Sequence, residues 1–541
     1  MPLSCIVAHL KGGIPLASAA HLKGSHFMVA YISRRLGVMV VILLGSSFIL
    51  YNLAALSGDP LDDLKTSTDP NRDFLIAQRT RQLQLDVPPP LRYFYWLRGV
   101  FGLFIGQANF GLTRAGITVG EELKQAIPVT IRLVLAATII AMILGIALGI
   151  ITALRQYSRF DYSLTFVAFL LFSLPVFWIA VLAKEYLAIT FNNFLRDPII
   201  PINVIVGMSF VGALFWASLI GRSRGKFWMT FGIVFVATAI VLKAMELVEW
   251  FTNPRLGPIL VFAASVGIAF GITQLSVGLT NRKALKASLA MSIATLVFYY
   301  PANYIFDNHI NALALLGMLV VTIAAGVISG ISFSKIDRGP IIRTAVLTAF
   351  LSALLILIDK FMRTWSRYSA TDAINYRPVP TIQERNAEID VTDFWLSNLD
   401  VIMHLFLPTV VLTLGSFAGY IRFSRGTLLE VLNQDYIRTA RAKGLTERTV
   451  IMRHAFRNTL IPISTIIVAD FAGVIGGAII TENVFGWSGM GTLFRRGIFT
   501  FDLNLLMGVF FVTTTLTLLA ILLADILYSA LDPRIRVGSG A

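Results

Sequence analysis

Very few side chains in this sequence could carry out chemistry. Asp470 lies in the middle of an apolar segment, 460–481, where an acidic side chain either lines an aqueous path or pairs with a polar group of a neighbouring helix. Both roles stay open. His404 has no second histidine at ligand spacing, which favours a structural hydrogen bond over metal binding. The single cysteine, Cys5, excludes a disulfide framework and a CxxC metal or redox site.

A nucleotide site is also not indicated. The run Gly221-Arg-Ser-Arg-Gly-Lys226 is rich in glycine and basic residues, but it lacks the spacing and the Ser/Thr that hold phosphates and Mg²⁺ in a phosphate-binding loop. We therefore predict no catalytic residues, no metal and no cofactor in this chain, and we do not expect it to be an enzyme.

The composition indicates which elements must position the few polar groups. Apolar residues make up 56% of the 541 residues, and 39 of them are Phe, far outside soluble globular usage. The formal net charge of +15 could suggest nucleic acid. In a chain this apolar, however, excess Lys and Arg belong first to the inner loops of a membrane protein, so no nucleic-acid partner is expected.

Runs of about 20 apolar residues are long enough to cross a hydrocarbon core of roughly 30 Å. The sequence predicts an all-α polytopic membrane protein with about twelve transmembrane helices. The predicted spans are 36–56, 129–153, 163–190, 203–220, 227–248, 258–280, 287–304, 311–331, 342–360, 402–421, 460–481 and 504–528.

Basic residues alternate between the loops in the manner of the positive-inside rule. With the N-terminus inside, Arg34 and Arg35 precede the first span, and the loop 422–459 carries a dense basic group, whereas the short outer loops are poor in Lys and Arg. Arg495 and Arg496 are an exception on the outside. We therefore expect both termini in the cytoplasm. The long outer segment 57–128 is predicted to form a small extracytoplasmic cap.

The inner loop contains the most ordered polar stretch. Asp435 is predicted to cap a short helix through Lys443, and Gly444 to end it in the left-handed conformation. Thr446 is predicted to cap a second helix, whose apolar stripe is Val450, Ile451, His454 and Ala455. Pro462 is expected to set the start of the next span. One interpretation of the basic residues is that they only hold the loop inside and contact anionic lipid headgroups.

The loop also resembles a known family. The run Asn433-Gln-Asp-Tyr-Ile-Arg-Thr-Ala-Arg-Ala-Lys-Gly-Leu445, followed by Arg453-His-Ala-Phe-Arg-Asn-Thr-Leu-Ile-Pro462, is similar to the coupling-loop signature of ABC-importer permeases, in particular the first permease subunit of oligopeptide and dipeptide systems. Further similar stretches are Gly415 to Arg425, Glu482-Asn-Val-Phe-Gly486, Gly489-Met-Gly491, Asp532-Pro-Arg-Ile-Arg536, Phe110-Gly111, Ala153-Leu-Arg155 and Asp161-Tyr162.

The resemblance implies a multi-pass permease in the cell membrane of a prokaryote that moves peptides inward by alternating access. It implies these partners: a second permease subunit, two cytoplasmic ATPase subunits that bind ATP and Mg, an extracytoplasmic substrate-binding protein, and membrane lipid. It also implies an ATPase-coupling loop, in which the small residues would allow close approach to the ATPase. The residues carried over to this loop are Asp435, Arg438, Ala440, Arg441, Gly444, Leu445 and Pro462. Asp470 would help to receive a peptide ammonium.

The chain departs from the six-span core of this family by an insertion. The resemblance divides it into an unstructured extension 1–27, a first core part 28–190, an inserted region 191–401 with about six spans, and a second core part 402–541. An even number of added spans keeps the coupling loop on the cytoplasmic side. The insert is interpreted as a peripheral bundle, a docking surface or a modified substrate path. Alternatives for the whole chain are a self-sufficient secondary transporter or channel, or a scaffold or sensor that acts through the insert.

Overall fold

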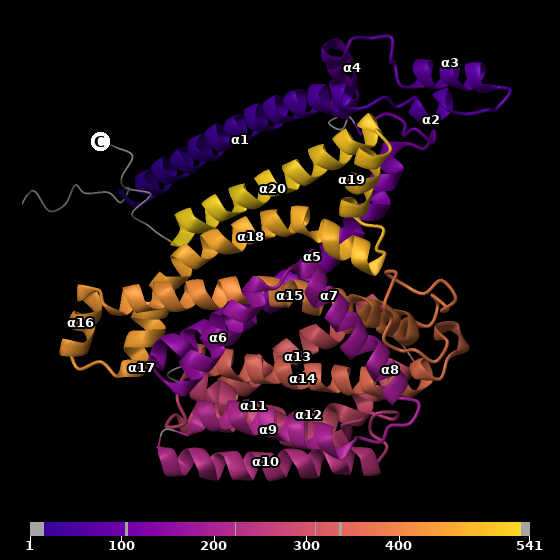
Figure 1. Ribbon diagram of the computed structural model, residues 1–541. Coiled ribbons are helices and arrows are strands. Elements are labelled where there is room, and N and C mark those ends of the chain that lie inside the picture. The colour runs from indigo at the N-terminus through magenta and orange to yellow at the C-terminus, as the bar shows by residue number, and fades with distance from the viewer. Residues whose placement is uncertain (1–15, 103–105, 222, 309, 335–337, 532–541) are drawn as a thin grey trace, which may run out of the picture. The chain divides into compact units, whose positions relative to one another are not determined.

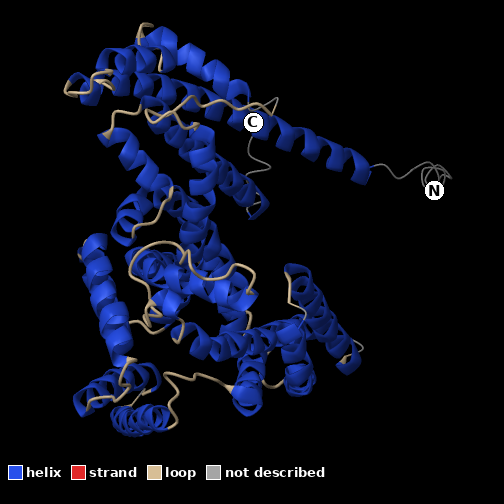
Figure 2. Cartoon of the chain, turned by 90° about the vertical axis from the view of Figure 1, so that its right-hand side faces the viewer, coloured by secondary structure: helices blue, strands red, loops and turns tan. Residues whose placement is uncertain are grey.

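The structure is a computed structural model that describes residues 16–102, 106–221, 223–308, 310–334 and 338–531. Within these ranges the chain is helical, and the β-type pairing is limited to one isolated bridge between Leu112 and Thr118 (Figure 2). The predicted all-α class is confirmed for this part of the chain. The chain divides into two compact units: unit 1 contains residues up to 181 and from 408 onward, and unit 2 contains residues 182–407.

Unit 1 is built around long helices that pack along one another. Helix α20 lies beside both α1 and α18, and α5 contacts α18, α19 and α20 (Figure 1). Its elements are α1 (Leu16–Ser57), α2 (Asp62–Lys65), α3 (Arg72–Gln82), α4 (Pro89–Phe101), α5 (Val119–Leu154), α6 (Arg159–Ser173), the start of α7 (Val176–Ala183), the second half of α15 (Phe394–Leu432), α16 (Asp435–Ala442), α17 (Glu447–Thr449), the π-helix η5 (Val450–Ala455), α18 (Phe456–Phe485), α19 (Met490–Phe499) and α20 (Leu503–Leu531).

The outer segment folds against the ends of the long helices. Helix α4 begins at Pro89, because proline fixes the backbone angle of a first helical turn and has no N–H to leave unpaired. Its buried Tyr93 and Trp96 join an apolar core with Tyr51, Val119 and Met507. Tyr93 also shares a 2.8 Å hydrogen bond with Ser47 of α1. Helix α4 is therefore packed against the rest of unit 1.

Helices α5 and α15 approach each other closely where α5 carries glycine. A Cβ added at Gly149 would lie 2.8 Å from both the Ile421 carbonyl oxygen and the Ser424 Cβ. A Cβ at Gly145 would lie 3.3 Å from the Phe417 carbonyl oxygen and would overlap Tyr420. Small residues allow backbones to pack at this distance in membrane helix pairs. This contact fixes the half of α15 that leads into α16.

Unit 2 is a bundle in which α12 and α14 contact each other and both contact α11 and α13, and α9 pairs with α10 (Figure 1). Small and hydroxyl residues fill its interior: Ser265 and Ser352 share a 2.7 Å hydrogen bond, and a Cβ at Gly330 would lie 2.5 Å from the Ile342 Cα. The elements are η3 (Lys184–Ile189), α8 (Thr190–Phe194), α9 (Ile202–Ile220), α10 (Arg224–Leu247), α11 (Gly257–Ser276), α12 (Arg282–Asn308), α13 (Ala312–Phe333), α14 (Arg338–Ser369) and η4 (Asp372–Ile374).

The described residues contain ten helices that are long and apolar enough to cross a membrane, or eleven if a bent pair counts as one span. The bent pair lies at the predicted span 163–190. The chain bends by 102° between α6 and α7, at Leu174 and Pro175, because proline cannot continue the hydrogen bonds of the preceding helix. The predicted span 460–481 lies within α18. The count of twelve stays a prediction.

Helix α1 begins twelve residues before the predicted start of structure at Met28, because it already includes Leu16. The residues concerned, 16–27, include three Ala and two Leu, which favour helix. Residues 1–15, with Cys5, and the tail 532–541 lie outside the described ranges. The predicted insert 191–401 lies within unit 2 by residue number, and its boundaries stay a prediction.

Candidate functional site: a coupling loop on unit 1

The polar loop contains a short helix, α16, which starts one residue earlier than a cap at Asp435 would place it. Gln434, with extended backbone, is the N-cap, and Asp435 is the first helical residue. The Asp435 carboxylate makes no cap hydrogen bond and lies 3.4 Å from the Arg438 guanidinium in a fully exposed pair. The predicted capping role of Asp435 is therefore wrong. Its negative charge still lies in the first turn, where it opposes the positive helix end.

One face of α16 is buried against its own chain. Ile437 is completely buried and Ala440 is 6% exposed, and both pack on Ala153 of α5, Leu428 of α15 and Val450 of η5. The prediction that Ala440 is small so that a partner can approach is corrected here, because its side chain faces unit 1 itself. A larger residue would lift α16 off this core. The helix is thus seated on the ends of two long helices.

Gly444 ends α16 in the predicted left-handed conformation, with φ +74°. The Gly444 N–H donates to the Arg441 carbonyl at 3.0 Å, and the Leu445 N–H donates to the Ala440 carbonyl at 3.4 Å. These two bonds form a Schellman motif, which pairs carbonyl groups that a helix end leaves free. No other heavy atom lies within 4 Å of a Cβ built on Gly444. The glycine is needed for its backbone angle and not for space.

Thr446 caps the second helix as predicted, since its Oγ1 accepts the Thr449 N–H at 3.4 Å. Of the predicted apolar stripe, Val450 and Ala455 are completely buried, and Ile451 and His454 are half-buried. However, α17 and the π-helix η5 continue directly into α18, so Pro462 lies inside α18 and not at its start. A proline removes one helical hydrogen bond without ending a membrane helix whose carbonyls find other partners. Residues 447–485, from the second helix of the loop to the end of the next span, therefore form one continuous helical segment.

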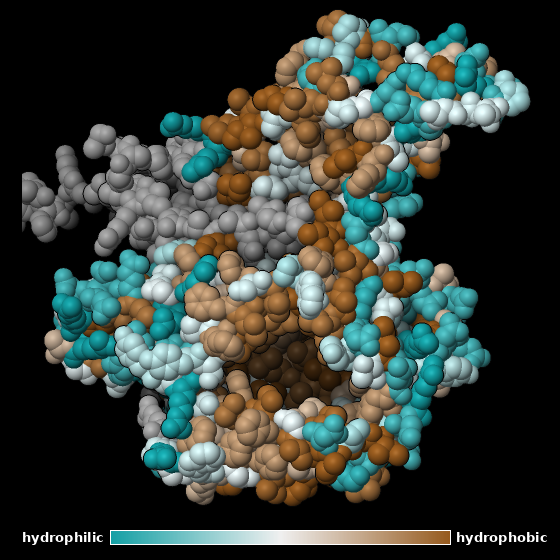
Figure 3. Space-filling view, in the orientation of Figure 1, coloured by the Kyte–Doolittle hydropathy of each residue, from teal (hydrophilic) through white to brown (hydrophobic). Residues whose placement is uncertain are grey.

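The outer face of the loop is polar and exposed. Hydrophilic residues gather over α16 and α17 at the left edge of Figure 3. Arg441 and Glu447 pair at 2.7 Å across the Gly444 turn, and Arg438 and Lys443 are exposed. Two large side chains stand among these charges, Tyr436 at 42% and Leu445 at 40% exposure. A mixed polar and apolar face of this kind is suited to contact with another protein.

Because of the Arg441–Glu447 pair, we predict that the stability of the folded loop depends slightly on pH. The hydrogen bond from Arg441 lowers the pKa of Glu447, so the folded loop gains stability above the unfolded pKa of about 4.3 and loses it as pH falls through the folded value. Because both side chains are exposed to solvent, we expect at most about 1 kcal/mol. Glu447→Gln should speed amide exchange at residues 441–449 up to about fivefold at pH 7, with no difference near pH 3. Asp73→Asn, in the exposed pair with Arg72 outside the loop, serves as the control and should leave exchange at residues 441–449 unchanged.

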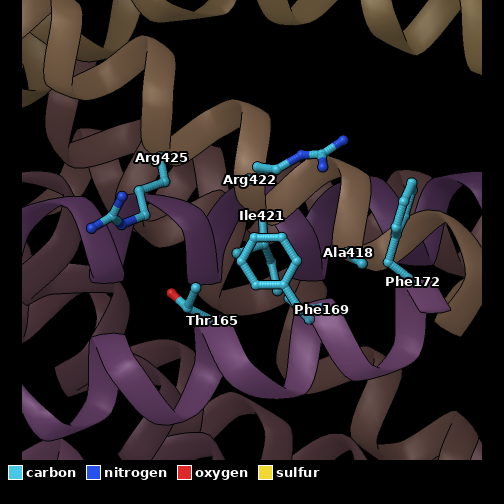
Figure 4. Close-up of a pocket in the computed structure, with 8 residues that line it drawn as sticks. Thr165, Phe169, Phe172, Ala418, Ile421, Arg422 and Arg425 are labelled. Carbon is cyan, nitrogen blue, oxygen red and sulfur yellow. The ribbon is translucent and has the colours of Figure 1, made fainter.

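A buried ion pair holds the helix that leads into the loop. The Arg425 guanidinium of α15 donates from Nε and Nη2 to the two carboxylate oxygens of Asp161 on α6, at 2.9 and 3.0 Å. The Asp161 side chain is 3% exposed, and it also accepts the Tyr157 N–H at 3.1 Å. Figure 4 shows Arg425 and Arg422 on α15 facing Thr165, Phe169 and Phe172 of α6 around a cavity of about 130 Å³.

The sequence contained both partners of this pair, but it gave no signal that they meet. Asp161 lies in the first turn of α6, where the Ser158 hydroxyl accepts its N–H at 3.1 Å. Arg425 belongs to a group of inner-loop arginines that looked alike in sequence. Asp161 and Arg425 are 264 residues apart in the chain, so no local sequence pattern indicates that they meet.

A second buried carboxylate was not assigned a role from sequence. Glu482, near the C-terminal end of α18, is completely buried. Its Oε1 accepts the Thr130 hydroxyl of α5 at 2.6 Å, and its Oε2 accepts the Thr492 N–H of α19 at 2.9 Å. Thr130 in turn accepts the Met490 N–H at 2.8 Å. This network ties α5, α18 and α19 together at the end of unit 1 opposite the loop.

The other sequence candidates differ in how the structure places them. Asp470 lies on α18, but its side chain is outside the part of the chain that the structure describes. His404 is 6% exposed, and its Nδ1 lies 2.8 Å from the Asp400 carbonyl oxygen and 3.2 Å from the Asp400 carboxylate. It makes the structural hydrogen bond that the sequence favoured.

Comparisons with known proteins bear on this site. Residues 287–537 match the family described as binding-protein-dependent transport system inner membrane component. The chain is 46% identical over 138 residues to the oligopeptide transport system permease protein OppB of Mycobacterium bovis. These 138 residues are 26% of this chain and 42% of OppB. It is 35% identical over 223 residues to the oligopeptide transport system permease protein AppB of Bacillus subtilis, covering 40% of this chain and 65% of AppB.

A third relative is the dipeptide transport system permease protein DppB of Escherichia coli, 41% identical over 138 residues that cover 26% of this chain and 41% of DppB. The chain thus spans about two fifths of the length of OppB and DppB. The family match begins inside the predicted insert and includes the whole coupling loop and α18 to α20. Together with the ten membrane-length helices, it identifies a multi-pass protein of the inner membrane. Residues 287–537 therefore belong to the family of binding-protein-dependent transport system inner membrane components.

Proposed function

We propose that the chain is the transmembrane permease subunit of an ATP-binding-cassette importer for peptides, and that it moves its substrate into the cytoplasm by alternating access. The names of the three relatives, two oligopeptide permeases and one dipeptide permease, support the substrate class. The match to a permease family disfavours a self-sufficient transporter or channel. Hydrolysis of Mg·ATP would take place in two partner ATPases, and a second permease and an extracytoplasmic binding protein would complete the complex.

The main observation that supports the proposal is that α16 packs firmly on other helices of its own chain. Its buried face, with Ile437 and Ala440, is fixed to α5, α15 and η5, while its opposite face is exposed. A push on the exposed face would therefore reach two membrane-length helices and, through η5, the start of α18. A rigid connection of this kind is what a subunit needs if it receives mechanical work from a partner and performs no chemistry itself.

The proposed orientation places both termini and the loop in the cytoplasm, with twelve spans in all. The basic residues of the loop 422–459 support this sidedness. We propose that Tyr436 and Leu445 enter a groove of the ATPase, because an exposed Tyr flanked by charges is a common anchor of protein interfaces. Arg438 and Lys443 would surround these anchors.

The Gly444 turn tests this proposal. Gly444→Val should uncouple ATP hydrolysis from uptake, because a β-branched residue at φ +74° is strained and reshapes the exposed face. With about 1–2 kcal/mol of strain, we expect uptake by the reconstituted complex to fall by roughly tenfold, while the protein still inserts and the ATPases still turn over.

Gly444→Asn is the matched variant, because Asn adopts the left-handed conformation more readily than other residues with side chains. It should retain most of the uptake. If Gly444→Val supports normal uptake at normal expression, the loop is not the coupling element and the proposal fails.

A further inference from the structure

Unit 2 contains a large polar cavity that the transport proposal does not use. Its volume is about 770 Å³, within the usual range of small-molecule sites. Four parts of unit 2 line it: the end of α8, the end of α14, the loop 373–386 and the start of α15. Every lining residue belongs to unit 2. The cavity is therefore described completely by this one unit.

The cavity has a positive lining. Arg196 and Arg377 both line it, and neither takes part in an ion pair with the acidic residues that the structure describes. Among the described lining residues there is no Asp or Glu. Asp372 lies beside the cavity wall, where its carboxylate accepts the Tyr376 hydroxyl. Both arginine side chains are exposed, so their guanidinium groups are open to a soluble ligand.

A buried histidine adds a third nitrogen group. His404 lines the same cavity and is 6% exposed. The Nδ1 atom faces two acceptors, the Asp400 carbonyl and the Asp400 carboxylate, so Nδ1 carries a proton. This leaves Nε2 as the ring nitrogen that can meet a ligand. Asp400 itself is occupied, since its carboxylate accepts the Tyr368 hydroxyl at 3.1 Å and the Asn386 N–H at 2.8 Å.

The cavity wall is rigidly built before any ligand binds. The Asn192 amide bonds the backbone of Val379 in both directions, from Nδ2 to the carbonyl at 2.8 Å and from the Val379 N–H to Oδ1 at 3.0 Å. Asn386 donates from Nδ2 to the Ala373 carbonyl at 2.7 Å. Asn375 and Gln383 in the same loop adopt positive φ, 52° and 69°, a strained backbone that surrounding contacts must hold. A preformed site loses little entropy on binding.

We propose that this cavity is a binding site for a small soluble molecule that carries a carboxylate. The planar guanidinium groups of Arg196 and Arg377 match carboxylate geometry and form strong charge-assisted hydrogen bonds with it. Asn193 and Gln383 line the cavity and offer amide donors and acceptors to the rest of the molecule. The site goes beyond the transport proposal, because binding there requires no ATPase and no second permease.

Binding is measured by titration calorimetry on the full chain in nanodiscs of phosphatidylcholine, with no other subunit present. The probes are trialanine and succinate, and their uncharged counterparts are trialanine amide and succinamide. We expect saturable binding of at least one carboxylate probe and at least about tenfold weaker binding of its amide, because the amide cannot form the charge-assisted hydrogen bonds with the guanidinium groups. Inorganic phosphate should not displace the probe.

The variant Arg196→Gln/Arg377→Gln should weaken binding of the carboxylate probe by tenfold or more, and Arg196→Lys/Arg377→Lys should lie between it and the original chain, because lysine keeps the charge but loses the planar fork. The matched control is Arg255→Gln, an exposed arginine of unit 2 outside the cavity. It should bind normally.

The proposal fails if neither carboxylate probe binds saturably, or if the amides bind as tightly as the carboxylates. It also fails if phosphate displaces the probe, which would indicate a phosphate site. An equal loss of binding in Arg255→Gln would overturn it as well. Since uptake is not measured, failure here leaves the coupling test at Gly444 unaffected, and failure at Gly444 leaves this site unaffected.

Discussion

Replacing Asp161 with asparagine is expected to destabilise unit 1 by about 3 kcal/mol. The substitution removes the charge that accepts both guanidinium bonds of Arg425, at 2.9 and 3.0 Å, and leaves the arginine beside a neutral amide. Breaking a fully buried pair by removing one partner costs about 3–5 kcal/mol. Because the Arg425 side chain is 30% exposed and can partly reach solvent, the lower end of that range applies.

The measurement is a thermal unfolding series on the detergent-solubilised chain, arranged as a double-mutant cycle with Arg425→Gln. Each single variant should unfold at a clearly lower temperature, and the double variant should be much less destabilised than the sum of the two, because the pair is lost only once. Asp435→Asn, which breaks the exposed pair with Arg438, is the control and should stay within about 0.5 kcal/mol of the original. Additive effects of Asp161→Asn and Arg425→Gln would show that the two groups do not stabilise each other.

This ion pair also marks the limit of prediction from sequence. The helices themselves were predictable, because each apolar run is long enough to cross a membrane and is bounded by charged or turn-forming residues. The turn at Gly444 and the cap at Thr446 were predictable for a similar reason: their hydrogen bonds join residues at most five positions apart. Asp161 and Arg425, by contrast, meet only after α6 and α15 have packed.

The predictions that were wrong concern features that distant parts of the chain or the exact backbone conformation decide. Asp435 was predicted to be the N-cap because an acidic residue before a helix is a good cap, but Gln434 with extended backbone precedes it and takes that position. Ala440 was assigned to the surface that contacts the ATPase because the family resemblance has a small residue at this position, whereas burial by α5, α15 and η5 decides its role. The bend at Pro175 was missed because hydropathy alone measured the length of the span 163–190.

The candidate sites were predictable to different degrees. The coupling loop was found through its charge, its caps and its resemblance to a family. The cavity with Arg196, Arg377 and His404 was not, since these three residues are spread over more than 200 positions and none stands in a motif. For Glu482 the local signal existed, namely an acidic residue at the end of an apolar span followed by Gly489 and Gly491. What was missing was the partner, Thr130, on a distant helix.

The second large effect concerns the glycines that contact Glu482. Gly491→Ala is expected to lower the free energy of unfolding by an amount on the order of 3 kcal/mol or more. A Cβ there would lie 2.6 Å from the Ile479 Cα and 2.8 Å from Glu482 Oε2. Overpacking alone costs about 1–3 kcal/mol, and displacing the buried carboxylate from the Thr492 N–H adds a comparable penalty for an unsatisfied charged group. Thermal unfolding in detergent measures the loss.

Gly489→Ala should also destabilise the protein, but for a different reason. This difference provides a test of the hydrogen-bond network around Glu482. The nearest atoms to a Cβ at Gly489 are all in side chains, the Glu482 carboxylate and Thr130 Oγ1 at 2.6 Å, whereas Gly491 faces the backbone of Ile479. Adding Glu482→Ala should therefore relieve much of the Gly489→Ala defect and little of the Gly491→Ala defect. Gly120→Ala, with no heavy atom within 4 Å, should be neutral or slightly stabilising. Equal relief of both defects would mean that the Ile479 backbone yields, and that α19 is positioned by the carboxylate alone.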